Sequence, residues 1–202
     1  LRSLFNELNR LKLWNRENPL KEIRQFKERQ RQELSYLKTE EINKLLNHLE
    51  GDTRKITLVC LATGARWSEA ERLRAEQVND HLITFTDTKS GKNRSVPISA
   101  DLSNHIKNRE FGRLFKPCYD DFRRSVKRAG FQFPQRQMTH ILRHSFASHF
   151  MMGGGNILVL QRILGHQSLT MTMRYAHFAL DHLQDAIRLN PLNSVDSLLT
   201  GH

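Results

Sequence analysis

Residues 139–151 read THILRHSFASHFM, and the helix that they encode organises the rest of the chain. Leu142, Phe146 and Phe150 recur at every fourth position, which is the spacing of one face of an α-helix. We therefore predict a helix over residues 139–151 whose apolar stripe enters the core of a domain.

The segments on both sides of this helix also have helical spacing, with one exception. Residues 82–86 and 94–98 read as two strands, and the Ser-Gly and Lys-Asn pairs between them fit a hairpin connection. Further helices are predicted at 39–49, 53–63, from Ser68 onward, 99–107, 119–129, 156–164 and 180–188. The expected fold class is mainly α with a small antiparallel β-sheet (α+β), in one domain over residues 35–189.

The composition points to a nucleic-acid partner. The 202 residues include 32 Lys and Arg against 21 Asp and Glu, so the net charge is 32 − 21 = +11. The isoelectric point is about 10, although a basic surface also serves solubility or an acidic membrane. No run of apolar residues is long enough to span a bilayer. The two cysteines, Cys60 and Cys118, indicate no disulfide framework, so a soluble protein of a reducing cytosol is expected.

The two ends of the chain differ from the predicted domain. Residues 1–34 are dense in charge, which fits either a solvated helix with an exposed linker, or the end of a preceding DNA-binding domain with a basic linker. Because the first residue is Leu1 and not Met, we expect a fragment of a longer protein. Residues 190–202 form a thin polar tail that a disordered end would also explain.

Three groups of residues, far apart in sequence, have the chemistry to handle a phosphate. Arg66 follows a predicted buried helix and a glycine turn, although a lone arginine there is usually a surface residue. His140 and Arg143 lie one turn apart at a predicted helix N-terminus, where free amides and the dipole favour an anion. An arginine binds two phosphate oxygens and a histidine moves a proton near neutral pH, yet structural hydrogen bonds would explain the histidines equally well.

The third group contains His166 and Tyr175, and a tyrosine in such a stretch is ordinarily a packing residue. Zinc binding by His140, His144 and His149 is disfavoured because neither CxxC nor HExxH spacing occurs. Considered together, the residues form one set able to attack a phosphodiester without a metal.

In order and separation, the three groups resemble the motifs of the tyrosine recombinase (phage integrase) family. They read TGARWSE at 63–69, HILRHSFASH at 140–149, and LGH at 164–166 followed after eight residues by YAH at 175–177. The resemblance covers residues 34–192, with Trp67 standing where the family often has an aliphatic residue. It is strongest to integrases of temperate phages, or their prophages, in Gram-negative bacteria.

The resemblance implies a DNA strand breakage and rejoining reaction that needs no metal, ATP or other cofactor. It assigns the catalytic roles to Tyr175 (nucleophile forming a 3′-phosphotyrosyl bond), Arg66 and Arg143 (phosphate binding), His140 (proton transfer), Lys89 (general acid, with Lys92 as the neighbouring alternative) and His166 (hydrogen bond to the phosphoryl group).

The resemblance also implies partners. Double-stranded DNA carrying attachment sites is the expected substrate, in the cytoplasm of a bacterial host. The expected assembly is a tetramer on synapsed DNA, with a dimer as an option for the free protein, and accessory DNA-bending proteins as further partners. Residues 190–202 are expected to pack on a neighbouring subunit.

Other functions fit parts of the same pattern. A type IB topoisomerase-like enzyme would use the same chemistry without exchanging DNA partners, and dependence on one attachment sequence would distinguish the two. A catalytically inactive DNA-binding protein of the same fold would not need all six positions filled. A helix-turn-helix repressor would account for the charge and helicity but not for Tyr175 with the two arginines.

Overall fold

The computed structural model describes residues 2–19, 35–86, 93–133 and 137–179. The chain divides into two compact units, residues 1–34 and 35–202. In the first unit, helix α1 (Arg2–Arg10) is followed by a turn that brings Trp14 against Phe5, with ring centroids 5.4 Å apart. The Asn18 side chain donates a 2.7 Å hydrogen bond to Asn6. These two contacts close the turn against the helix.

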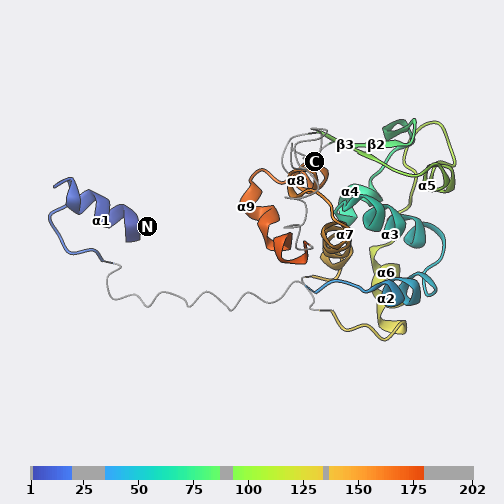
Figure 1. The fold of residues 1–202 in the computed structure, drawn as a ribbon, viewed down its shortest axis with the longest axis horizontal. Coiled ribbons are helices and arrows are strands. Elements are labelled where there is room, and N and C mark those ends of the chain that lie inside the picture. Colours follow the sequence, from blue (N-terminus) through green and yellow to red (C-terminus); the bar gives the residue numbers. More distant parts are fainter. Residues whose placement is uncertain (1, 20–34, 87–92, 134–136, 180–202) are drawn as a thin grey trace, which may run out of the picture. The chain divides into compact units, whose positions relative to one another are not determined.

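The second unit is a helical domain with one small sheet, and Figure 1 shows the order of its elements. Its helices are α2 (Thr39–Leu46), α3 (Gly51–Thr63), α4 (Trp67–Glu71), η1 (Ala75–Gln77), α5 (Ala100–Ile106), α6 (Tyr119–Arg128), α7 (His140–Met152), α8 (Ile157–Leu164), α9 (Leu169–Thr172) and η2 (Met173–Phe178). The predicted fold class is confirmed.

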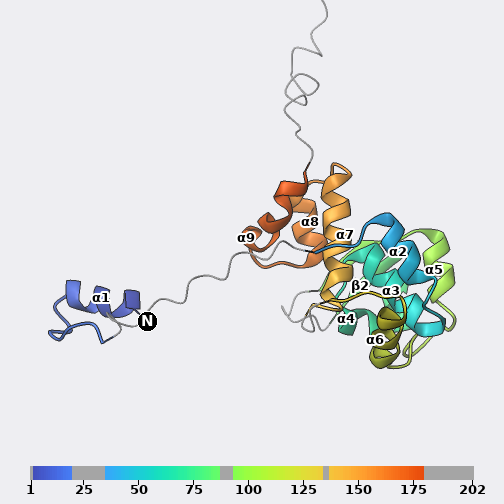
Figure 2. The ribbon, with the colours of Figure 1, turned by 90° about the horizontal axis from the view of Figure 1, so that it is seen from below.

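Helices α3 and α7 lie side by side at the centre of this domain, as Figures 1 and 2 show from two directions. Helix α3 is mostly apolar beyond its charged first turns, and two of its buried threonines are satisfied within the helix. Thr57 and Thr63 donate hydroxyl hydrogen bonds of 2.9 and 2.6 Å to the carbonyls of Thr53 and Val59. Such bonds remove the cost of burying a hydroxyl, so α3 can be surrounded by other elements.

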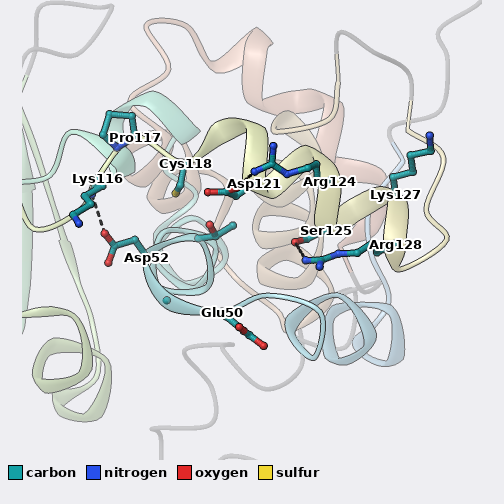
Figure 3. Close-up of a pocket in the computed structure, with 12 residues that line it drawn as sticks. Glu50, Asp52, Lys116, Pro117, Cys118, Asp121, Arg124, Ser125, Lys127 and Arg128 are labelled. Atoms are coloured by element: carbon teal, nitrogen blue, oxygen red, sulfur yellow. Dashed lines mark hydrogen bonds and ion pairs between the residues drawn. The ribbon is translucent and has the colours of Figure 1, made fainter.

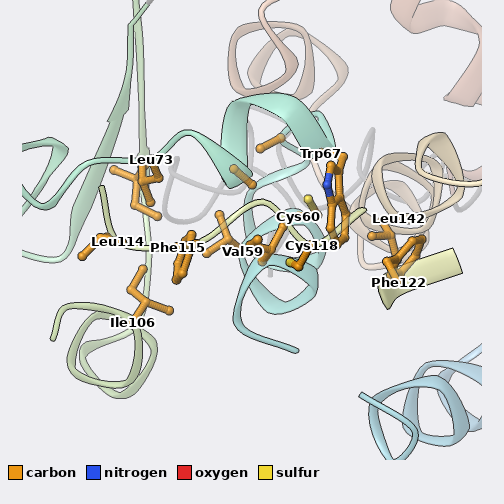
Figure 4. Packing of buried hydrophobic residues seen from close by; sticks show 14 of the residues in the cluster. Val59, Cys60, Trp67, Leu73, Ile106, Leu114, Phe115, Cys118, Phe122 and Leu142 are labelled. Atoms are coloured by element: carbon orange, nitrogen blue, oxygen red, sulfur yellow. The ribbon is translucent and has the colours of Figure 1, made fainter. Parts of the chain in front are cut away.

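The hydrophobic core extends from α5 through α3 and α4 to α6 and α7 (Figure 4). Trp67, the residue at which the sequence departs from the family pattern, is accommodated there. Its ring lies 4.5 Å from that of Phe122, centroid to centroid, and its indole N–H donates to the Glu71 carboxylate at 3.0 Å. Glu71 also accepts from the Cys118 amide, so one carboxylate joins α4 to the start of α6. The tryptophan therefore fits the packing without leaving its N–H unpaired.

The sheet has three antiparallel strands in the order β1 (Val78–Asn79), β2 (Leu82–Phe85) and β3 (Arg94–Pro97). Ile83 pairs with Val96 and Phe85 with Arg94, and these four side chains are buried. The two predicted strands are confirmed. The sequence did not predict β1, because two residues are too few to show alternation. The connection between β2 and β3 lies outside the described residues.

Two further predictions need correction or remain open. The helix predicted from Ser68 onward starts one residue earlier: α4 begins at Trp67, and Glu69 accepts a hydrogen bond from the Arg66 amide at 2.9 Å. Helices α9 and η2 were not predicted, because a four-residue helix and a 3₁₀ segment are too short for a periodic signal. The predicted helix 180–188 and the tail 190–202 lie outside the described residues.

Candidate active site

Arg143 is the centre of the candidate site and lies at the end of the first turn of α7. Its side chain is buried, and its two terminal nitrogens donate hydrogen bonds of 2.8 Å to the Gly64 carbonyl and 2.6 Å to the Leu164 carbonyl. One guanidinium therefore connects the end of α3 with the end of α8. Burial, followed by the positive charges of Arg66 and Arg94, lowers the pKa of Arg143 to about 10, so it stays cationic at neutral pH.

Arg66 lies in the turn between α3 and α4, where a carboxylate holds it. Its guanidinium is paired with Glu69 at 2.9 Å, and the same carboxylate pairs with Arg94 of β3 at 2.6 Å. Arg94 stacks over the Phe85 ring and donates to the Ile163 carbonyl at 2.8 Å. Burial alone would raise the pKa of Glu69, but the bonds and charges of Arg94 and Arg66 outweigh it and lower the pKa. Glu69 is therefore an anion that fixes two cations.

His166 follows directly on α8, after Gly165, which ends the helix in the left-handed conformation. Its Nδ1 lies 2.9 Å from the Thr172 hydroxyl. Burial, and then the positive charges of Arg143, Arg66, Arg174 and Arg94, lower the pKa of His166 to about 4. The imidazole is therefore neutral at pH 7, and the charges that act on it show that it lies among cationic side chains.

Tyr175 lies on η2 and is 1% exposed. Its hydroxyl oxygen is 2.7 Å from Nδ1 of His144, a buried residue of α7. Burial raises the pKa of Tyr175, against the opposing effect of the Arg143 and Arg174 charges. The phenol is thus protonated at neutral pH and close enough to Arg143 for that charge to act on it.

The structure brings together four of the six predicted site residues. Arg66, Arg143, His166 and Tyr175 come from three separate segments and are connected through the charges and bonds described above. His140 is the first residue of α7, its side chain is exposed, and its ring centroid lies 6.3 Å from that of His144. Lys89 and Lys92 lie outside the described residues, so their positions stay predictions.

Sequence reasoning missed three residues that hold the site together: His144, Glu69 and Arg94. His144 and Glu69 lie within the quoted motifs. Sequence reasoning considered His144 only as a zinc ligand and gave Glu69 no role. Arg94 had a detectable signal, because it alternates with Val96 on the buried face of its strand. A cation at such a position requires a buried anionic partner, which here is Glu69.

Hollows flank this cluster on two sides. One, of about 330 Å³, is lined by Arg66, Arg72 and Arg74 among others, and a second, of about 740 Å³, lies along β3 and α8 and includes His166. A larger groove of about 1010 Å³, drawn in Figure 3, is formed by residues of α3 and α6 and the chain between α5 and α6. Its lining mixes several acids and bases, whereas the hollow beside Arg66 is lined by three arginines and by Glu69 as the one carboxylate, so it is better suited to a polyanion.

Two findings hold for the described part of the chain. None of its helices has the length and apolar character needed to cross a membrane. No group of three or more His, Cys, Asp or Glu side chains lies there in an arrangement that could hold a metal ion.

The fold and the site define a mostly helical domain in which a buried tyrosine lies near a buried, arginine-rich cluster. The sequence profile of the phage integrase family matches residues 35–182. The chain belongs to the phage integrase family.

Individual relatives are consistent with this assignment. The integrase of Escherichia phage 186 is 54% identical over 195 residues, which is 95% of this chain and 58% of that protein. The solved catalytic domain of bacteriophage HP1 integrase is 53% identical, with a TM-score of 0.76 over 80% of this chain and 98% of that domain. The Tn1549 transposon integrase, solved with a circular intermediate DNA, is 18% identical with a TM-score of 0.65 and shares the fold. The chain thus spans somewhat more than half of its curated phage relative, and nearly all of a catalytic domain.

Proposed function

We propose that this chain is the catalytic domain of a site-specific DNA recombinase, an integrase that cuts and rejoins DNA through Tyr175 for phage or prophage integration and excision. The observation that carries the proposal is the buried Arg143 cation. Its guanidinium donates hydrogen bonds to two neutral carbonyls, and the positive charges of Arg66 and Arg94 affect its pKa more than the negative charge of Glu69 does. A site of this kind gains electrostatic stability when an anion enters. Tyr175, whose pKa responds to the Arg143 charge, is the residue to which we assign the nucleophilic role.

The proposed reaction begins with attack of the Tyr175 hydroxyl on the scissile phosphate. A bond forms between the phenolic oxygen and phosphorus, the bond to the 5′-oxygen breaks, and a 3′-phosphotyrosyl link remains. Arg143 has five N–H donors, of which two are bonded to carbonyls, so others can bind the non-bridging oxygens together with Arg66. A donor of this kind contributes about 3 kcal/mol to the stability of the transition state.

The remaining catalytic roles are proton transfer and a hydrogen bond to the phosphoryl group. His140 handles the phenol proton, Lys89 protonates the departing 5′-oxygen, and the neutral His166 hydrogen-bonds the phosphoryl group. The link conserves the energy of the broken ester, so a 5′-hydroxyl from a second DNA reverses the step without a nucleotide cofactor. Double-stranded DNA in the bacterial cytoplasm is the proposed partner, because its phosphates match the net charge of +11.

Strand exchange between two duplexes requires four active sites, so we propose a tetramer on synapsed DNA, with a dimer and DNA-bending proteins as further options. Residues 1–34 are proposed as the end of a preceding DNA-binding domain with its linker, and 190–202 as a tail exchanged between subunits. The high identity to phage integrases favours recombination over supercoil relaxation, the activity of the topoisomerase-like alternative.

A nicked duplex carrying the element's own attachment site tests the proposal, because loss of a short strand after cleavage traps the covalent adduct. The chain should yield a slowly migrating band on a denaturing gel, and Tyr175→Phe should yield none. Tyr119→Phe, on an exposed tyrosine of α6, is the matched control and should behave as wild type. Clear binding of this DNA without any adduct would instead support the inactive DNA-binding alternative. Relaxation of plasmids that lack the site would support the topoisomerase-like one.

A further inference from the structure

We propose that His144 is a positioning residue for the nucleophile, holding the Tyr175 hydroxyl in place from α7 for the reaction. This inference rests on the proposed function. It goes beyond that function because none of the catalytic roles assigned above involves His144. The evidence is the 2.7 Å contact between His144 Nδ1 and the Tyr175 hydroxyl, made within the core by two buried side chains.

The nucleophile needs such an anchor because its own segment is weakly constrained. Tyr175 lies on a six-residue 3₁₀ segment, η2, where hydrogen-bond geometry is poorer than in an α-helix. Its neighbours Met173 and Arg174 are exposed, so the burial of Tyr175 against α7 is what orients this part of the segment. The phenol oxygen moves with its ring, so a hydrogen bond at this end of the side chain restrains the tilt of the whole ring and orients the O–H bond.

The anchor is attached to the phosphate-binding residue. His144 directly follows Arg143 in the same helix, so α7 holds the Tyr175 hydroxyl with one residue and offers the phosphate its cation with the previous one. The helix thereby fixes the distance between the attacking oxygen and the bound phosphorus. Errors of about 1 Å in such a distance cost about 100-fold in rate.

The protonation states favour positioning over proton removal. Burial, followed by the charges of His140, Arg174 and Arg143, lowers the pKa of His144 to about 4, while burial raises that of Tyr175. At neutral pH the proton stays on the phenol, so the bond joins two neutral groups and holds the oxygen without ionising it.

The test measures single-turnover adduct formation on the nicked attachment-site duplex, together with the dissociation constant for the same DNA. His144→Leu introduces an apolar side chain of similar volume and removes the bond. His144→Asn places an amide atom near the position of Nδ1, whereas His144→Gln places it near that of Nε2. We expect His144→Leu and His144→Gln to slow the step by about 10- to 100-fold at saturating DNA, with unchanged binding and with His144→Asn restoring most of the rate.

A substrate with sulfur replacing the bridging 5′-oxygen separates this role from that of the general acid, because a thiolate leaves without a proton. The defect of His144→Leu should persist on this substrate. Wild-type or faster rates for both His144→Leu and His144→Gln would overturn the inference, as would failure of His144→Asn to outperform His144→Gln. Absence of any adduct from the wild type would instead contradict the proposed function. If His144→Leu fails to fold, the comparison of the Asn and Gln variants decides.

Discussion

Gly64 offers a sharp test of how the α3 end and Arg143 are packed. Its φ is +64°, and a Cβ added there would lie 2.6 Å from both the Leu164 Cδ2 and the Phe146 Cδ1 atoms. Its carbonyl also accepts the 2.8 Å hydrogen bond from Arg143. Gly64→Ala therefore introduces backbone strain and a steric clash in the same place.

The two contributions can be separated by a control. Left-handed backbone costs a non-glycine residue about 1 to 2 kcal/mol, and overpacking a core costs about 1 to 3 kcal/mol. Gly51 has a φ of +51° with nothing within 4 Å of the added Cβ, so Gly51→Ala has the strain without the clash. The effect of alanine on the unfolded chain is the same in both variants and cancels in their difference.

We expect Gly64→Ala to lower the free energy of unfolding by about 2 to 5 kcal/mol, and by about 1 to 3 kcal/mol more than Gly51→Ala. Urea titrations followed by circular dichroism measure both values, with equal m-values confirming that the transitions are comparable. Equal losses in the two variants would refute the close packing of α3, α7 and α8 around Gly64.

Two further predictions concern charged and titrating groups. Glu69→Gln removes the anion between Arg66 and the buried Arg94, so the free energy of unfolding should fall by about 3 kcal/mol in urea titrations, because a buried cation is left uncompensated. A loss of unfolding free energy no larger than that of the exposed control Glu110→Gln would contradict the role of Glu69. The second prediction is a loss of stability in mild acid. The pKa of His144 is about 4 in the folded protein against an ordinary value of 6.5, so the unfolded chain takes up this proton first. Its contribution, at most about 3 kcal/mol, is fully present above pH 6.5 and is lost as the pH falls towards 4. His144→Asn should flatten this part of the stability–pH curve, and an unchanged slope would show that His144 does not titrate abnormally.

The sequence predicted the helical scaffold well because its periodic signals are local. The apolar stripe of α7 and the continuous apolar run of α3 are long enough to identify both central helices. The glycine stops at Gly64 and Gly165 also placed helix ends correctly, since both adopt the left-handed conformation. By contrast, β1 and η2 depend on the strands and helices around them, so no local pattern marks them.

The site was predictable as a set of residues but not as an arrangement. Motif spacing identified Arg66, Arg143, His166 and Tyr175, and the structure brings these four together. Motif spacing could not show that the Tyr175 hydroxyl contacts His144, because that contact depends on how η2 packs against α7. Neither could it show that Glu69 binds Arg94, a residue 25 positions away in another element. Contacts of this kind are set by tertiary packing and leave no spacing signature.

The central claim, that Tyr175 forms the covalent bond to DNA, is tested most directly by mass spectrometry of the trapped adduct. After nuclease and protease digestion, the account predicts that a short nucleotide remains attached through its 3′-phosphate to the peptide containing Tyr175. Fragmentation of that peptide should place the added mass on Tyr175 itself. Attachment to another residue, or a 5′-phosphate link, would contradict the account.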